Sequence, residues 1–331
     1  MTNSIGILGA GRMGRGIALS YIFAGVPVLL VDLKERSDDA REALLKSVLE
    51  EIGKDLEFLA RVGLVEADRV PDILSLVHFS HRQDTKNPLQ HCAIIYEGVP
   101  EVMAAKRDAF SYASDCASDD AIIASTTSTF LVTDLAGLVS NHQRFMNAHW
   151  LNPAHLMPLV EISRSDETDQ GAIDSLIASL ESIGKVPVVC SASPGYIVPR
   201  IQALAMNEAA RLVEEGVASA EDIDKAISVG FGIRFSVLGV LEFIDWGGGD
   251  ILHYGSKYLA ENIGSRFEAP QIIADNMRLG RNGLRDGKGF FDYKDTDIDA
   301  YREQRMLDFV AQLKHKNLLP RYKATTDDAP S

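Results

Sequence analysis

The chain has 331 residues, of which 46% are hydrophobic, and its formal net charge is −14 at pH 7. This length suits two domains with buried cores, and the acidity disfavours nucleic acid and anionic membranes as partners. Cys92, Cys116 and Cys190 are scattered without a CxxC pair, which argues against disulfides and a metal site. The N-terminus shows no secretion leader and no apolar run is long enough for a membrane span, so we expect a cytoplasmic protein.

Short apolar runs alternate with helical patterns over residues 1–192. Strands are expected at 4–8, 26–31, 77–79, 92–96, 121–124, 145–149, 159–162 and 186–190, with helices at 13–24, 35–61 and 106–113. The first strand, helix and second strand follow one another directly, as in the βαβ unit of a parallel sheet. The predicted class is therefore α/β, with a doubly wound Rossmann sheet.

The pattern changes after residue 192. Helices are expected at 203–215, 220–229 and 299–313, with a glycine-rich loop at 280–289 and no alternating strands. We therefore predict a Rossmann domain at 1–192 and an all-α C-terminal domain at 193–331.

A glycine-rich turn, GAGRMG, follows the first strand. Gly9 permits a tight turn, Gly11 lets a pyrophosphate approach the backbone, and Gly14 lets the helix pack closely on the strand. Arg12 and Met13 open that helix, whose free N–H groups attract phosphate. Because the turn lies between a strand and a helix, it predicts a dinucleotide site.

Asp32 ends the second strand, where a carboxylate accepts hydrogen bonds from the adenosine ribose. Its negative charge disfavours a 2′-phosphate, so NAD is favoured over NADP, although Lys34 and Arg36 nearby weaken this exclusion. FAD, or a glycine turn without a ligand, are the alternatives.

His149 ends the sixth strand-like run, and Glu161 lies in the next one. Hydride removal from an alcohol requires a base for the hydroxyl proton, and histidine, with an ordinary pKa of about 6.5, suits this task. Glu161 would orient the ring if its strand returns beside the first, whereas a purely structural histidine is the alternative. Ser128 follows the fifth strand, where it is either a substrate donor or a turn cap.

Together these motifs resemble the 3-hydroxyacyl-CoA dehydrogenase family from residue 5 to 293. The resemblance rests on the glycine turn with Asp32 and on the segments YEGVPE (96–101), STTS (125–128), HWLNP (149–153), LVE (159–161), SPGYI (193–197) and GKGFFDY (287–293). It implies NAD-dependent oxidation of a 3-hydroxyacyl group, as in fatty acid metabolism, by a Rossmann domain and a helical domain that forms a homodimer.

The resemblance also implies roles for single residues. His149 is implied as the general acid or base and Glu161 as its partner. Positions that hydrogen-bond the substrate or lie in the active site are Ser128 and Asn152. Positions near the nicotinamide ribose are Glu101 and Lys106.

Two departures from the family pattern lie close to the expected site. Pro199 stands before Arg200 where the family often has asparagine, and proline offers no amide side chain to a substrate carbonyl. Trp150 replaces the usual phenylalanine, and we expect it to contact the substrate with added bulk and an N–H donor beside His149.

The substrate class stays open between a CoA thioester and a free acid. Residues 50–57 are net acidic where acyl-CoA members carry lysines, and Pro158 stands where such members commonly have lysine. These features resemble members acting on gulonate, carnitine or pyridine carboxylates, and Arg234 or Arg200 would clamp a carboxylate. The overall resemblance favours a 3-hydroxybutyryl-CoA-like thioester. A non-catalytic, crystallin-like NAD-binding protein is the alternative of another class, motivated by Pro199.

Overall fold

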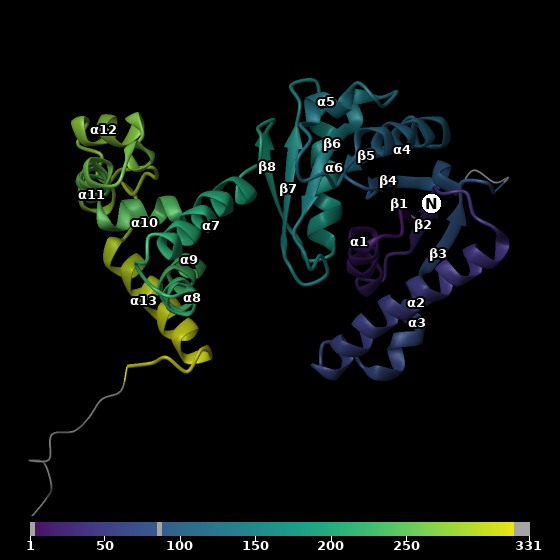
Figure 1. The fold of residues 1–331 in the computed structure, drawn as a ribbon, viewed down its shortest axis with the longest axis horizontal. Coiled ribbons are helices and arrows are strands. Elements are labelled where there is room, and N and C mark those ends of the chain that lie inside the picture. The colour runs from purple at the N-terminus through teal and green to yellow at the C-terminus, as the bar shows by residue number, and fades with distance from the viewer. Residues whose placement is uncertain (1–3, 85–87, 321–331) are drawn as a thin grey trace, which may run out of the picture. The chain divides into compact units, whose positions relative to one another are not determined.

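The computed structural model describes residues 4–84 and 88–320, and the chain folds as two units, Met1–Met206 and Asn207–Ser331 (Figure 1). The sequence placed residues 193–206 in the helical domain, whereas in the structure they group with the first unit. Tyr196 of this segment donates a hydrogen bond to the carbonyl of Thr127. The domain limits given by the sequence stay a prediction.

The first unit is built on one sheet with the strand order β3-β2-β1-β4-β5-β6-β7-β8. Neighbouring strands are parallel except β6 and β7, which are antiparallel. The strand order reverses between β1 and β4, which is the switch point where open α/β sheets bind ligands. The strands are β1 (Ser4–Leu8), β2 (Val28–Asp32), β3 (Val77–His81), β4 (Cys92–Glu97), β5 (Ile122–Ser125), β6 (Phe145–Trp150), β7 (Leu159–Arg164) and β8 (Val186–Ser191).

Helices cover both faces of this sheet, and each face has its own hydrophobic core. On one face α1, α2 and α6 contribute residues such as Ile17, Ile52 and Leu176, and on the other face α4 and α5 contribute Phe110 and Leu135. Coverage of both faces explains why the central strands are apolar throughout rather than alternating. The predicted fold class is confirmed. The helices are α1 (Arg12–Phe23), α2 (Asp38–Arg61), α3 (Val70–Leu74), α4 (Met103–Cys116), α5 (Val132–Ala136) and α6 (Gln170–Ser182).

Helices make up the regular structure that follows β8. They are α7 (Val198–Glu214), which runs across the limit between the units, α8 (Ala220–Ala226), a π-helical segment (Ile227–Gly232), α9 (Ile233–Val237), α10 (Val240–Gly247), α11 (Gly249–Asn262), α12 (Gln271–Arg278) and α13 (Ile298–His315). In the described part of the chain, no single helix has the length and hydropathy to cross a membrane. Only the bent pair Ala220–Val237 and Val240–Gly247, with 89° between its halves, passes that test when taken together.

The glycine-rich loop after α12 is held by a buried carboxylate of α10. Asp245 accepts hydrogen bonds from the N–H of Phe290 at 2.9 Å and from the hydroxyl of Tyr293 at 3.1 Å. A Cβ on Gly283 or Gly289 would lie 2.1 or 2.0 Å from atoms of Asp245. Gly283, Gly289 and Tyr293 therefore serve the packing of this loop against α10.

Candidate active site

The glycine-rich turn between β1 and α1 lies at the carboxyl edge of the sheet. Gly9 has a φ of 99°, and a Cβ on Gly14 would lie 2.1 Å from the carbonyl oxygen of Gly9, so neither position accepts a side chain. A Cβ on Gly11 would meet no atom within 4 Å, so a ligand can approach the backbone there. The first turn of α1 has no side-chain cap and no acidic residue, which leaves its N–H groups available to phosphate.

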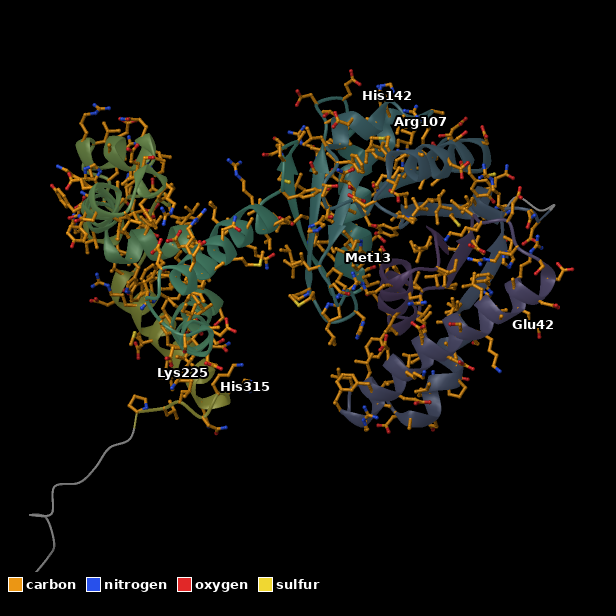
Figure 2. All side chains as sticks on the ribbon, in the orientation of Figure 1. Met13, Glu42, Arg107, His142, Lys225 and His315 are labelled. Atoms are coloured by element: carbon orange, nitrogen blue, oxygen red, sulfur yellow. The ribbon has the colours of Figure 1, made fainter. Side chains whose placement is uncertain are left out.

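Arg12 and Met13 begin α1 but face different surroundings. Met13, labelled in Figure 2, is partly buried against the core that α1 and α2 share, so it offers a phosphate only its backbone N–H. Arg12 is exposed and lines a pocket of about 200 Å³ together with Asn152. Its guanidinium is therefore accessible to a ligand, and the cofactor role of both residues stays a prediction.

A second pocket, of about 370 Å³, lies beside the glycine turn and is bounded by residues that follow β1, β2 and β4. Asp32, the last residue of β2, lines this pocket and is largely buried. Its carboxylate accepts hydrogen bonds from the Arg36 guanidinium and from the N–H of Lys34, and lies 3.6 Å from Nδ1 of His81. These residues fit a dinucleotide, because an uncapped helix end can bind phosphate and the carboxylate in the pocket can accept hydrogen bonds from ribose hydroxyls.

A buried ion cluster follows β4. Lys106 of α4 is 1% exposed, and its ammonium lies 3.0 Å from carboxylate oxygens of both Glu97 and Glu101. Burial opposes ionisation of Glu101, but hydrogen bonds from Thr127, Thr129 and Lys106 outweigh it and lower the pKa of Glu101 to about 2. Lys106 is thus enclosed by two carboxylates, and Glu101 is the partly exposed member. The expected place of both residues near the nicotinamide ribose stays a prediction.

The antiparallel pairing of β6 and β7 places His149 directly opposite Glu161. Nδ1 of His149 lies 2.9 Å from Oε2 of Glu161, whose other oxygen accepts the N–H groups of Ile197 at 2.9 Å and Val198 at 2.8 Å. Glu161 is fully buried, whereas His149 is 7% exposed. Because Glu161 engages Nδ1 as a donor, Nε2 is left as the acceptor of the ring.

Tyr196, which the sequence reasoning did not single out, covers one face of the His149 ring. The two rings stack with centroids 4.9 Å apart and 10° between their planes. The tyrosine hydroxyl donates to the carbonyl of Thr127 at 2.7 Å and accepts from the amide of Asn147 at 3.0 Å. Its φ of 46° is uncommon for an aromatic residue. The SPGYI segment carried this residue, but no spacing rule connects that segment to the histidine.

Ser128 and Asn152, both expected at the substrate, are exposed and follow the carboxyl ends of β5 and β6. The N–H of Ser128 donates to Glu101 at 3.2 Å. Asn152 lines the 200 Å³ pocket, where Arg15 of α1 pairs with Glu51 of α2 at 2.7 Å. The fold brings both residues to the sheet edge that carries the glycine turn, and their contact with a substrate stays a prediction.

A buried lysine fastens the loop that follows β6. Lys185 donates to the carbonyl oxygens of Ala154 at 2.6 Å and Met157 at 3.0 Å, and its ammonium lies 5.5 Å from the centre of the Trp150 ring. Burial lowers the pKa of Lys185 to about 8. The sequence reasoning missed this residue, because its partners are backbone carbonyls of a distant loop rather than a charged motif.

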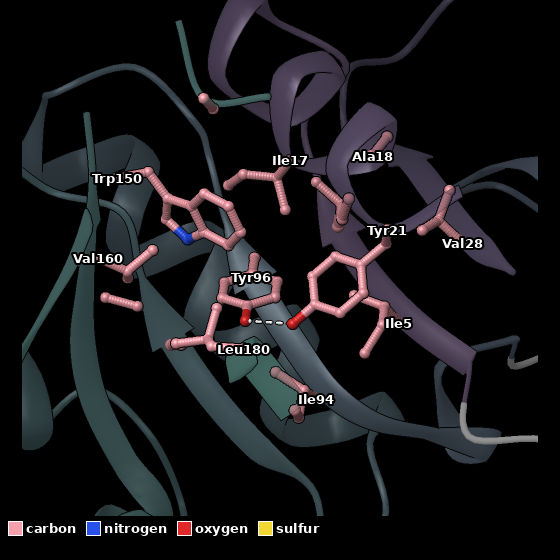
Figure 3. Packing of buried hydrophobic residues seen from close by; sticks show 14 of the residues in the cluster. Ile5, Ile17, Ala18, Tyr21, Val28, Ile94, Tyr96, Trp150, Val160 and Leu180 are labelled. Atoms are coloured by element: carbon pink, nitrogen blue, oxygen red, sulfur yellow. Dashed lines mark hydrogen bonds between the residues drawn. The ribbon is translucent and has the colours of Figure 1, made fainter. Parts of the chain in front are cut away.

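Trp150 is a core residue, which corrects the expectation that it contacts the substrate. Successive residues of a strand face opposite sides of the sheet, so Trp150 points away from the side that holds the His149 ring. Trp150 is 1% exposed and packs against Tyr21 and Tyr96, whose ring centroids lie 6.4 and 5.7 Å away (Figure 3). This packing leaves no surface of Trp150 for a substrate.

Two further residues singled out in the sequence lie after β8. Pro199 occupies the first turn of α7, where a helix tolerates a missing N–H. Arg234 lies in the second unit, and its guanidinium is 4.7 Å from the centre of the Phe243 ring. Its expected role as a carboxylate clamp stays a prediction.

Two family models cover most of the chain. The model of the 3-hydroxyacyl-CoA dehydrogenase NAD binding domain matches residues 4–193, and the model of the C-terminal domain matches residues 195–293. The chain belongs to the 3-hydroxyacyl-CoA dehydrogenase family. This protein is therefore an NAD-dependent oxidoreductase that acts on a CH–OH group, which confirms the predicted enzyme class and cofactor.

Relatives within this family carry names with different substrates. The 5-formyl-3-hydroxy-2-methylpyridine 4-carboxylate 5-dehydrogenase of Mesorhizobium japonicum is 28% identical over 316 residues, which cover 94% of this chain and 97% of the relative. A probable 3-hydroxybutyryl-CoA dehydrogenase of Bacillus subtilis is 30% identical over 290 residues, which cover 87% of this chain and 96% of the relative. The crystal structure of an Archaeoglobus fulgidus 3-hydroxyacyl-CoA dehydrogenase superposes with a TM-score of 0.75 at 30% identity, covering 96% of this chain and 99% of that one.

Proposed function

We propose that this family member oxidises the secondary alcohol of a short 3-hydroxy acid, with His149 as its acid–base group and with the substrate carried as a free carboxylate. The observation that carries the proposal is the contact of His149 Nδ1 with the buried Glu161 carboxylate at the end of β6. This arrangement supplies a general base whose orientation is fixed before the substrate arrives.

The cofactor serves hydride transfer, and residues of the chain serve proton transfer. When bound, NAD supplies the nicotinamide ring that accepts the hydride. His149 takes the hydroxyl proton at Nε2, while Glu161 holds the Nδ1–H and stabilises the resulting imidazolium. Tyr196 stacks on the ring and limits its rotation. In the direction of reduction, the same nitrogen returns the proton to the ketone oxygen.

The charge of α2 supports a free acid. This helix carries seven acidic residues against four basic ones. Among the acidic residues, Glu50 is exposed, whereas Glu51, which lines the 200 Å³ pocket with Asn152, is paired with Arg15. The CoA nucleotide carries several phosphate charges, which such a surface repels. The Mesorhizobium relative, named for a pyridine carboxylate substrate, agrees with this choice.

A comparison of substrates tests the proposed class. The rate of NAD reduction should be measured with 3-hydroxybutyrate, carnitine, gulonate and 3-hydroxybutyryl-CoA. We expect kcat/KM for a free acid to exceed that for the thioester by about 100-fold or more, because charge repulsion and the missing phosphate contacts act together. A preference of that size for the thioester would contradict the free-acid assignment.

The thioester remains the second candidate, because the Bacillus relative, named for 3-hydroxybutyryl-CoA, is 30% identical and matches 96% of its own length.

A crystallin-like protein that binds NAD without turnover is the alternative of another class. It predicts no NAD reduction with any of the four compounds. The expected cytoplasmic location and the expected part in fatty acid metabolism stay predictions.

We further propose that the helical unit pairs with a second copy of the chain. Six large apolar side chains are buried among the described residues of this unit, namely Ile223, Ile233, Leu238, Ile273, Leu284 and Tyr293. Ile251, Tyr254 and Tyr258 of α11 are each at least 64% exposed. An apolar surface of this kind is typical of an interface. Sedimentation should give twice the chain mass of 36.1 kDa, whereas a single chain mass at micromolar concentration would contradict the proposal.

A further inference from the structure

The nucleotide pocket contains an arginine whose charge compensates that of Asp32. The Arg36 guanidinium donates to Oδ2 of Asp32, and the side chains of Asp32 and Arg36 are 7% and 28% exposed. Nδ1 of His81 also faces Oδ2, at 3.6 Å. The other oxygen, Oδ1, accepts only a long hydrogen bond from the N–H of Lys34, at 3.4 Å, among the described residues. Oδ1 is therefore the oxygen that a ribose hydroxyl can engage.

The charges around this carboxylate change what the pocket can accept. Asp32, Lys34 and Arg36 all line the same pocket of about 370 Å³, so one carboxylate is set against two side-chain cations. An unpaired aspartate at this position repels a 2′-phosphate, whereas an arginine beside it can bind that phosphate with two parallel hydrogen bonds. Arg36 is partly exposed and joined to Asp32 through a single nitrogen, so the rest of its guanidinium can turn to a phosphate.

We propose that Arg36 lets the nucleotide site bind NADP(H) as well as NAD(H). Arg36 neutralises Asp32 and contacts the 2′-phosphate of NADP(H), while Oδ1 of Asp32 still accepts the 2′-hydroxyl of NAD(H). Arg36 and Asp32 act on the adenosine end of the cofactor, and His149 acts on the substrate. The choice between NAD(H) and NADP(H) is therefore independent of the role of His149 and of the substrate class.

Arg41 offers a matched control on the first turns of α2. Its side chain is 23% exposed, close to the exposure of Arg36, and it pairs with Asp38 and Asp84 rather than with Asp32. Replacing either arginine by alanine removes one positive charge from the same region. Only the Arg36 substitution removes the group in contact with Asp32.

The test is calorimetric titration of the full chain with NADH and with NADPH. For the wild type we expect the Kd for NADPH to lie within about tenfold of that for NADH. Arg36→Ala should raise the ratio of the Kd for NADPH to the Kd for NADH by about tenfold or more. The reason is the loss of a charge-assisted contact with the 2′-phosphate, which weakens NADPH binding. Arg36→Lys, which keeps the charge, should give a ratio between those of the wild type and Arg36→Ala. Arg41→Ala should give the wild-type ratio.

Retained NADH binding shows that each variant is folded. Two results overturn the proposal. One is a wild-type preference for NADH of more than about 100-fold, which corresponds to about 2.7 kcal/mol. The other is an equal change of the ratio in Arg36→Ala and Arg41→Ala, which would assign the effect to net charge alone.

Discussion

Replacing His149 by alanine is expected to lower kcat by about 10²–10⁴-fold while leaving the Kd for NADH close to the wild-type value. The loss follows because Nε2 of His149 is the proposed acceptor of the hydroxyl proton, whereas the glycine turn and Asp32 lie at the ends of other strands. Steady-state NAD reduction gives kcat, and the fluorescence of bound NADH gives the affinity.

A second histidine–glutamate pair supplies the control for this substitution. His142 lies just before β6, and its Nε2 is 3.3 Å from the carboxylate of Glu167, with both side chains exposed. His142→Ala should keep wild-type turnover, because the pair lies at the opposite end of the strand from His149. Unchanged turnover in His149→Ala would remove the proposed acid–base role of His149.

Glu161→Gln is expected to lower kcat by about 10²–10⁴-fold and the free energy of unfolding by about 2–4 kcal/mol. The carboxylate accepts from His149 Nδ1 at one oxygen and from two backbone N–H groups at the other. A glutamine has one oxygen and one NH₂ group, so it can satisfy only one side. If the NH₂ faces His149, Nδ1 becomes the acceptor and Nε2 carries the proton, which is the wrong tautomer for a base.

Turnover and urea unfolding of the same variant measure the two effects together. Glu167→Gln is the matched control, since Glu167 contacts a histidine at an exposed site, where such pairs contribute little to stability. A Glu161→Gln variant with wild-type kcat would show that the carboxylate does not orient the ring. A variant that loses kcat but keeps its stability would show that the backbone contacts of Glu161 carry little energy.

The sheet and its cofactor turn could be predicted because local rules govern them. Apolar runs bounded by turns predicted all eight strands, and the GAGRMG turn with Asp32 depends on spacing within one βαβ unit. The sequence predicted that Glu161 pairs with His149 only if the strand of Glu161 returns beside the strand of His149. The antiparallel register of β6 and β7 meets that condition.

The parts of the site that the sequence did not predict depend on contacts between distant segments. Tyr196 reaches His149 from beyond β8, and Lys185 bonds carbonyl groups about thirty positions earlier in the chain. Trp150 was misassigned because adjacency to His149 in sequence says nothing about which face of the sheet a side chain takes. Arg36 was noticed as a nearby charge, but its hydrogen bond to Asp32 required coordinates.

In the proposed mechanism His149 takes the substrate proton. Single-turnover kinetics isolate this step, because they separate hydride transfer from product release. The NAD complex of His149→Ala should be mixed with the preferred substrate of the wild type, and the first NADH formed should be followed by absorbance. We predict that this step slows by about 10²–10⁴-fold relative to the wild type and to His142→Ala. A first turnover as fast as that of the wild type would show that His149 does not take the proton.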